Sequence, residues 1–94
     1  MMEYLKNHIL DEIDGAIEYM EKAIEFKGTE WGSKFRKMSE MEAEHANCLT
    51  KMFNSMEKSE NVSDAQYAEM SHQILDKYSS SMGKLEAMKR LYWE

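Results

Sequence analysis

The sequence predicts an all-α protein, an antiparallel helical hairpin followed by a third, C-terminal helix. The 94 residues include no proline and only four glycines, so long helices can run without interruption. Apolar side chains recur at steps of three and four along most of the chain, which is the period of a helix and not of a strand. At this length we expect one small domain, residues 1–94, whose modest core favours oligomerisation.

The first helix is predicted at about residues 3–27. Gly28 is a typical C-terminal stop, and Thr29 is a typical N-cap for a following helix. Because the turn between them is so short, the first two helices must be antiparallel neighbours. The apolar positions that mark the first helix are Leu5, Ile9, Ile13, Ala16, Ile17, Met20, Ala23 and Ile24.

Two further helices are predicted at about residues 30–57 and 64–92, separated by the polar segment 59–63. Ser63 and Gln66 form a capping-box pattern at the start of the last helix. We interpret both tryptophans and the methionines as core or subunit contacts. The apolar positions are Trp31, Phe35, Met38, Leu49, Met52 and Met56 in the second helix, and Ala68, Leu75, Tyr78, Met82, Leu85, Met88 and Tyr92 in the third.

The charge pattern argues against two classes of partner. The net charge is −6 and no block of basic residues is present, so we expect neither nucleic acid nor an anionic membrane surface to be bound. No segment has the roughly 20 apolar residues of a membrane span, and acidic residues interrupt the apolar runs near the N-terminus, unlike in a signal peptide. We therefore expect a cytoplasmic protein.

Two polar side chains lie in the centre of the second helix's apolar stripe. The same steps of three and four that connect its apolar residues also reach Glu42 and His45. An unpaired buried carboxylate is costly, so something must compensate Glu42. A metal ion is one candidate, and a hydrogen-bonded cluster without metal is the alternative. Because the two residues are three positions apart, they project from one face and can bind one metal ion together.

Glu12 adds a third ligand to this layer. It lies on the inward side of the first helix, again a carboxylate among apolar residues. The point midway along the sequence between Glu12 and His45 falls in the predicted turn, so the hairpin brings Glu12, Glu42 and His45 to nearly the same height. We interpret these three residues as metal ligands with a catalytic role.

Three ligands make half of a di-metal site. A two-fold dimer of hairpins would bring four carboxylates and two imidazoles into one layer, which is the set found in di-iron carboxylate four-helix bundles. We therefore predict a homodimer, or a larger even-numbered homo-oligomer, that forms a four-helix bundle with two iron ions per dimer. Zinc, manganese and calcium are expected substitutes.

These segments resemble the ferritin-like di-iron carboxylate superfamily. Residues 12–19 are similar to its first-helix pattern, in which a metal-bridging glutamate is followed seven residues later by a tyrosine. Residues 40–46 are similar to its Glu-x-x-His segment. The chain most resembles the encapsulated-ferritin branch, whose ferroxidase centre forms between two hairpin subunits. The resemblance implies ferroxidase activity on Fe(II), with Glu12, Glu42 and His45 as ligands and Tyr19 as their neighbour.

Two features depart from that pattern. Gly15 stands where the family usually has alanine, so it either lowers helix stability or permits a close approach of helices. The resemblance implies a protein nanocompartment as host, but the last residues, 89–94, continue the third helix. We therefore expect no flexible tail that docks to such a shell.

The remaining candidate residues have simpler interpretations. Glu69 and His72 form a second Glu-x-x-His, but it lies about 16 Å along the axis from Glu42, so we interpret it as surface or structural. Cys48 is interpreted as a small buried hydrophobic residue. The alternative function for the chain is a non-enzymatic helical oligomer or scaffold, with a structural metal or none.

Overall fold

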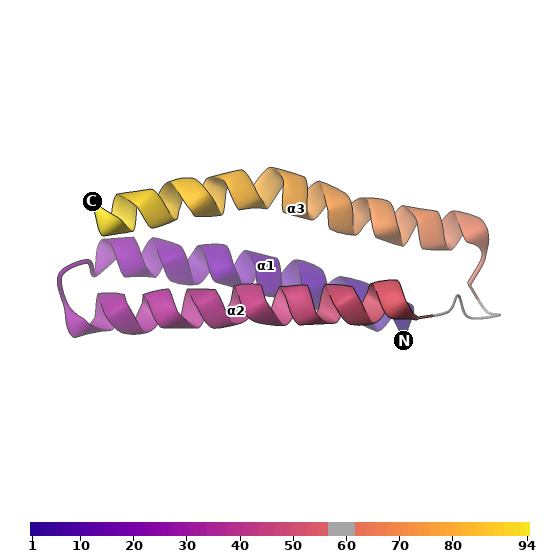
Figure 1. The fold of residues 1–94 in the computed structure, drawn as a ribbon, viewed down its shortest axis with the longest axis horizontal. Helices are drawn as coiled ribbons and strands as arrows, with labels where there is room; N and C mark the ends of the chain where they lie inside the picture. Colours follow the sequence, from indigo (N-terminus) through magenta and orange to yellow (C-terminus); the bar gives the residue numbers. More distant parts are fainter. Residues whose placement is uncertain (57–61) are drawn as a thin grey trace.

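The fold is three helices, seen in a computed structural model that describes residues 1–56 and 62–94. The helices are α1 (Met2–Glu25), α2 (Glu30–Ser55) and α3 (Asp64–Trp93), and no strand occurs in these two ranges. Figure 1 shows α1 and α2 as an antiparallel hairpin and α3 running back along it, parallel to α1. Because α1 packs against both α2 and α3, it is the central helix. The predicted all-α hairpin with a third helix is confirmed.

The helix ends follow the predicted capping residues. Gly28 has a φ of 88°, a left-handed conformation that glycine adopts without strain, so the chain reverses there. The Thr29 hydroxyl accepts the Gly32 N–H at 3.3 Å and caps α2. The α1 helix ends at Glu25 rather than at residue 27, because the turn needs the residues that follow.

The later boundaries agree in part with the prediction. Both hydrogen bonds of the predicted capping box between Ser63 and Gln66 are present at the start of α3. The α3 helix extends to Trp93, one residue beyond the predicted end. The α2 helix ends at Ser55, whereas the predicted end at residue 57 and most of the predicted polar turn lie outside the described residues.

Small side chains bring α1 and α2 close together. The buried residues of α2 are Gly32, Ser39, Ala46 and Phe53, which recur every seven residues and lie on one side of the helix. Ser39 donates a 2.6 Å hydrogen bond to the Ala16 carbonyl oxygen of α1, and both residues are buried. This contact sets the height of α2 against α1.

The α3 helix covers the other side of α1. Its buried apolar residues pack in two clusters against α1 and α2, and polar contacts flank them: Lys77 pairs with Asp14, and Lys84 with Glu21. At the end near the hairpin turn, the Arg36 guanidinium of α2 lies 5.0 Å from the centre of the Trp93 ring, so it bridges to α3. The buried α3 residues are Met70, Ile74, Ser81, Leu85 and Met88.

Several residues predicted to be inward are exposed in the single chain. On α3, Ala68 and Leu75 are exposed, and so is Trp93. On α2 the exposed residues are Trp31, Met38 and Met52, so they are not in the core of one chain, and the alternative interpretation as subunit contacts stays a prediction. The reason is rotational: α2 turns its small residues and Phe53 inward, and the larger apolar residues one position earlier then point outward. No helix in the described ranges is long and apolar enough to cross a membrane.

Candidate metal centre

Glu12, Glu42 and His45 converge halfway along the hairpin. Glu12 comes from α1, while Glu42 and His45 come from adjacent turns of α2. One ligand atom from each lies within 4.8 Å of the others, and His45 Nδ1 is 3.8 Å from Glu12 Oε2. The structure therefore brings together the three residues that the sequence selected, at one height of the hairpin.

One oxygen of this cluster lacks a partner. Glu12 Oε2 is buried and accepts no hydrogen bond from any residue in the described ranges. A buried oxygen without a hydrogen bond is unfavourable unless a cation or water compensates it. Two carboxylates and one imidazole are donors that suit divalent iron, manganese or zinc. The residues present therefore fit a metal ion.

The carboxyl group of Glu42 holds its proton more tightly than an ordinary glutamate does. The pKa of Glu42 rises from 4.5 to about 7, first because of a side-chain hydrogen bond with Glu12, then because of burial and charge repulsion. His45 acts in the opposite direction. Near neutral pH the metal-free cluster thus exchanges a proton that a cation would displace, since ligands must be deprotonated to bind a metal.

The centre opens toward solvent on one side. The Glu12 side chain is only 20% exposed, whereas that of His45 is 55% exposed. The imidazole stands on the face of α2 that also carries the exposed Met38, Met41 and Met52. The cluster thus lies beside an open, partly apolar face of the hairpin, with His45 on its solvent-exposed side.

A family comparison agrees with this geometry. The rubrerythrin family model matches residues 3–94, almost the whole chain. The chain belongs to the rubrerythrin family. This family is part of the ferritin-like di-iron superfamily, and its domains bind iron. A search of curated proteins and a search of solved structures each gave no match.

The three candidate residues correspond to half of the ligand set that di-iron carboxylate bundles use. Di-iron carboxylate bundles use a glutamate from each of two helices and a Glu-x-x-His pair from each of two others. In the described residues, α1 supplies one such glutamate, Glu12, and α2 supplies one such pair, Glu42 with His45. The second Glu-x-x-His, on α3, is not part of this cluster.

That second pair lies at the surface, as predicted. Glu69 and His72 are exposed, and His72 Nε2 is 3.2 Å from Asp76 Oδ2, an ion pair within α3. Both side chains of the pair are exposed and stand apart from Glu12, Glu42 and His45, so this pair adds no ligand to the candidate centre.

Two other candidates differ from expectation. Cys48 is exposed, so its interpretation as a buried residue is wrong. It lies on the outward side of α2, beyond His45, because the inward side is occupied by Ala46 and Phe53. Tyr19 is half-buried and stacks on Phe35 with ring centres 6.2 Å apart. Within residues 1–56 and 62–94 it makes no hydrogen bond to the three ligands, and its role as their neighbour stays a prediction.

Two small residues shape the centre, of which sequence reasoning named Gly15 and missed Ser39. An added Cβ on Gly15 would lie 2.9 Å from Glu42 Oε2, and Ser39 bonds to α1 one turn before Glu42. The sequence held a signal for Ser39, because small residues recur every seven positions along α2 beside its larger apolar stripe. Such a repeat is typical of a close helix–helix contact.

Proposed function

We propose that this protein is a ferroxidase that oxidises Fe(II) at a di-iron site formed between two copies of the chain. The observation that carries the proposal is the half-set of ligands on an open face. Glu12, Glu42 and His45 fit a metal ion, and their layer is exposed on the His45 side. A second copy placed there would double the set to four carboxylates and two imidazoles.

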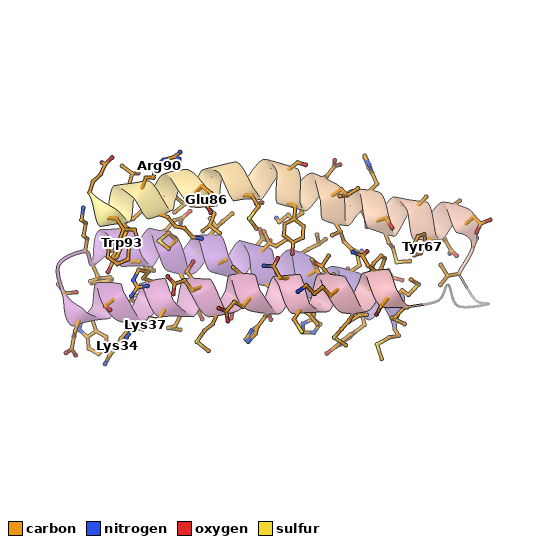
Figure 2. The ribbon with its side chains drawn as sticks, in the orientation of Figure 1. Lys34, Lys37, Tyr67, Glu86, Arg90 and Trp93 are labelled. Carbon is orange, nitrogen blue, oxygen red and sulfur yellow. The ribbon has the colours of Figure 1, made fainter. Side chains whose placement is uncertain are left out.

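The face around His45 supports self-association. It exposes Trp31, Met38, Met41 and Met52, whose relative exposures range from 38% to 56%. Lys34, whose side chain Figure 2 shows on the side of α2 that points away from α3, lies over the Trp31 ring. A two-fold interface joins the same surface patch of both subunits, so this apolar face can bury itself against its own copy.

The ligand types suit the oxidation. Carboxylates can bridge two ions and stabilise the higher charge of ferric iron, and each imidazole binds one ion. Each of the two ferrous ions, the substrate, gives up one electron. Dioxygen takes both electrons with two protons and leaves as hydrogen peroxide, whereas peroxide as oxidant would leave as two water molecules. Glu42 releases its proton when the metal enters, because its pKa of about 7 lies near neutral pH.

An anaerobic Fe(II) titration followed by exposure to air tests the proposal. We expect binding of about one ion per chain, and then a ferric absorbance band and oxygen consumption. The double variant Glu42→Ala with His45→Ala should lose both. The matched control is Glu69→Ala with His72→Ala, which removes the exposed second Glu-x-x-His and should behave as wild type.

Two results would contradict the proposal. One is unchanged iron binding and oxidation in the variant that lacks Glu42 and His45. The other is a protein that metal stabilises strongly against heat but that consumes no oxygen, which would favour the alternative of a scaffold with a structural metal. The encapsulated-ferritin branch, and a location in the cytoplasm or in a protein shell, stay predictions from the sequence.

A further inference from the structure

Gly15 lies directly against one of the proposed ligands. A Cβ atom built on Gly15 would lie 2.9 Å from Oε2 of Glu42 and 3.4 Å from its Cδ. Cβ atoms in proteins essentially never approach another atom within 3.0 Å, so a larger residue here would force the carboxylate to move. The absent side chain of Gly15 therefore provides the space in which this carboxylate lies.

The other glycines of the chain have different surroundings. All four lie in the described ranges, and Gly28 serves the turn through its positive φ. A Cβ on Gly32 would meet the Phe26 backbone oxygen, and one on Gly83 would meet nothing within 4 Å. Only at Gly15 would the added atom meet the side chain of a candidate metal ligand.

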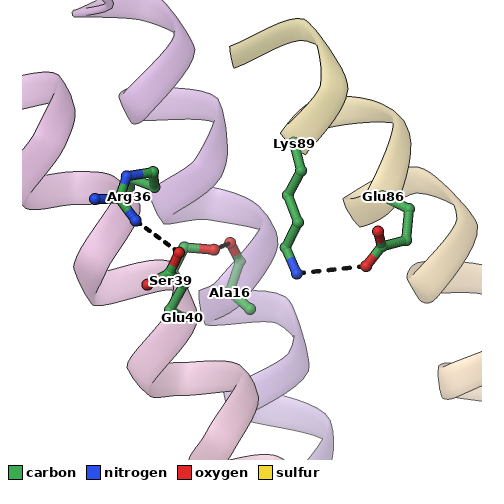
Figure 3. A network of polar contacts seen from close by, with 6 residues as sticks. All are labelled: Ala16, Arg36, Ser39, Glu40, Glu86 and Lys89. Carbon is green, nitrogen blue, oxygen red and sulfur yellow. Dashed lines mark hydrogen bonds and ion pairs between the residues drawn. The ribbon is translucent and has the colours of Figure 1, made fainter. Parts of the chain in front are cut away.

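The two helices are held too close to move apart beside Gly15. Figure 3 shows the Ser39 hydroxyl bonded to the Ala16 carbonyl oxygen, at 2.6 Å. Ala16 directly follows Gly15, and Ser39 lies one turn before Glu42, so the bond fixes both backbones next to the carboxylate. A side chain at position 15 would therefore displace the flexible end of Glu42 and leave the helices in place.

We propose that Gly15 is a positioning residue for the metal centre, which lets the Glu42 carboxylate lie against α1 beside Glu12. This inference rests on the proposed function. Glycine inside a helix lowers stability relative to alanine. At position 15 this loss of helix stability accompanies the space that the Glu42 carboxylate needs. The consequence is a separation of two effects: adding a methyl group at position 15 should harm metal binding without harming the metal-free fold.

The variant Gly15→Ala tests this separation, and Gly83→Ala is the matched control. Both replace a helical glycine, and Gly83→Ala should raise the Tm of the metal-free protein by about 4 to 8 °C. Gly15→Ala should leave that Tm no lower than in wild type. It should weaken Co(II) binding by about 10- to 100-fold and change the visible Co(II) absorption spectrum, which reports ligand geometry. Gly83→Ala should bind Co(II) as wild type does.

A double-mutant cycle with Glu42→Ala gives a readout that needs no metal. Removing the Glu42 side chain removes the atoms that the new Cβ meets, so Gly15→Ala should raise Tm more in that background than in wild type. Equal shifts in the two backgrounds would overturn the proposal. Unchanged Co(II) affinity and spectrum in Gly15→Ala would overturn it as well, and so would weaker binding that sedimentation traces to a lost dimer.

Failure of the proposed function would look different. A wild-type protein that binds neither Co(II) nor Fe(II) would contradict the metal centre itself, and with it any role for Gly15 in metal binding. A wild-type protein that binds Co(II) but does not oxidise Fe(II) would contradict the ferroxidase activity alone. In that case the Co(II) affinities of Gly15→Ala and Gly83→Ala still decide whether Gly15 positions Glu42.

Discussion

The raised pKa of Glu42 makes the stability of the metal-free protein depend on pH. The pKa of Glu42 rises from 4.5 to about 7 on folding, so the folded protein holds this proton more tightly than the unfolded chain. Below the unfolded value both states are protonated. As pH rises through the window from 4.5 to about 7, the unfolded chain loses the proton first, and the free energy of unfolding falls.

We therefore expect the metal-free protein to be less stable at about pH 7.5 than at about pH 5. One pKa unit corresponds to about 1.4 kcal/mol, and solvent screening at this partly exposed site reduces the total to about 2 kcal/mol. Urea unfolding at several pH values measures the slope, and Glu42→Gln, which cannot titrate, should flatten it. A stability that rises over this window would contradict the raised pKa of Glu42.

The three ligands were predictable from the sequence, while their surroundings were not. Heights along two antiparallel helices follow from residue counting, so the sequence alone predicts the layer of Glu12, Glu42 and His45. Side-chain direction depends on how α2 rotates against its neighbours. That rotation exposes Cys48, which the sequence pattern predicts to be buried. The same rotation places the Glu42 carboxylate, and not the backbone of α2, against Gly15.

At the scale of the helices, α2 carries two adjacent seven-residue repeats that compete for the inward position. One repeat is buried and consists of small residues except for the phenylalanine at its end: Gly32, Ser39, Ala46 and Phe53. The other comprises Trp31, Met38, His45 and Met52. Amphipathicity favours the larger residues, so the sequence interpretation chose them for the core. The close contact with α1 favours the small residues instead. Close helix packing therefore outweighs the larger apolar area that the other repeat could have buried.

Ser39 is the residue through which the spacing of α1 and α2 can be tested. Ser39→Ala removes one buried hydrogen bond to Ala16 and should cost about 1 kcal/mol of stability. Ser39→Leu inserts bulk into the contact and should cost about 1–3 kcal/mol or more. Urea unfolding measures both, with Ser79→Ala on exposed α3 surface as the control. If Ser39→Leu were as stable as wild type, α1 and α2 would not be in close contact there.

At the scale of the whole molecule, the proposed function needs a complete set of ligands, and the described residues of one chain supply half of it. The ligand half-set, the exposed imidazole and the outward apolar residues lie on one face of α1 and α2, away from the core clusters that involve α3. A symmetric dimer satisfies all three at once, because a two-fold axis duplicates ligands and covers the apolar face in the same step. Dimerisation and iron binding are then coupled, since each iron ion would be held by residues of both copies.

Met41→Glu tests that coupling. Met41 is 53% exposed on the His45 face, so a charge there should leave the helical content of the chain unchanged while opposing burial against a second copy. We expect the variant to sediment as a monomer in the presence of Co(II), and to lose Fe(II) oxidation. The matched control is Leu75→Glu, 64% exposed on α3, which should remain dimeric and active. If Leu75→Glu dissociated and Met41→Glu did not, the subunit contact would lie on α3, the half-set of ligands would stay open to solvent, and the shared di-iron site would be wrong.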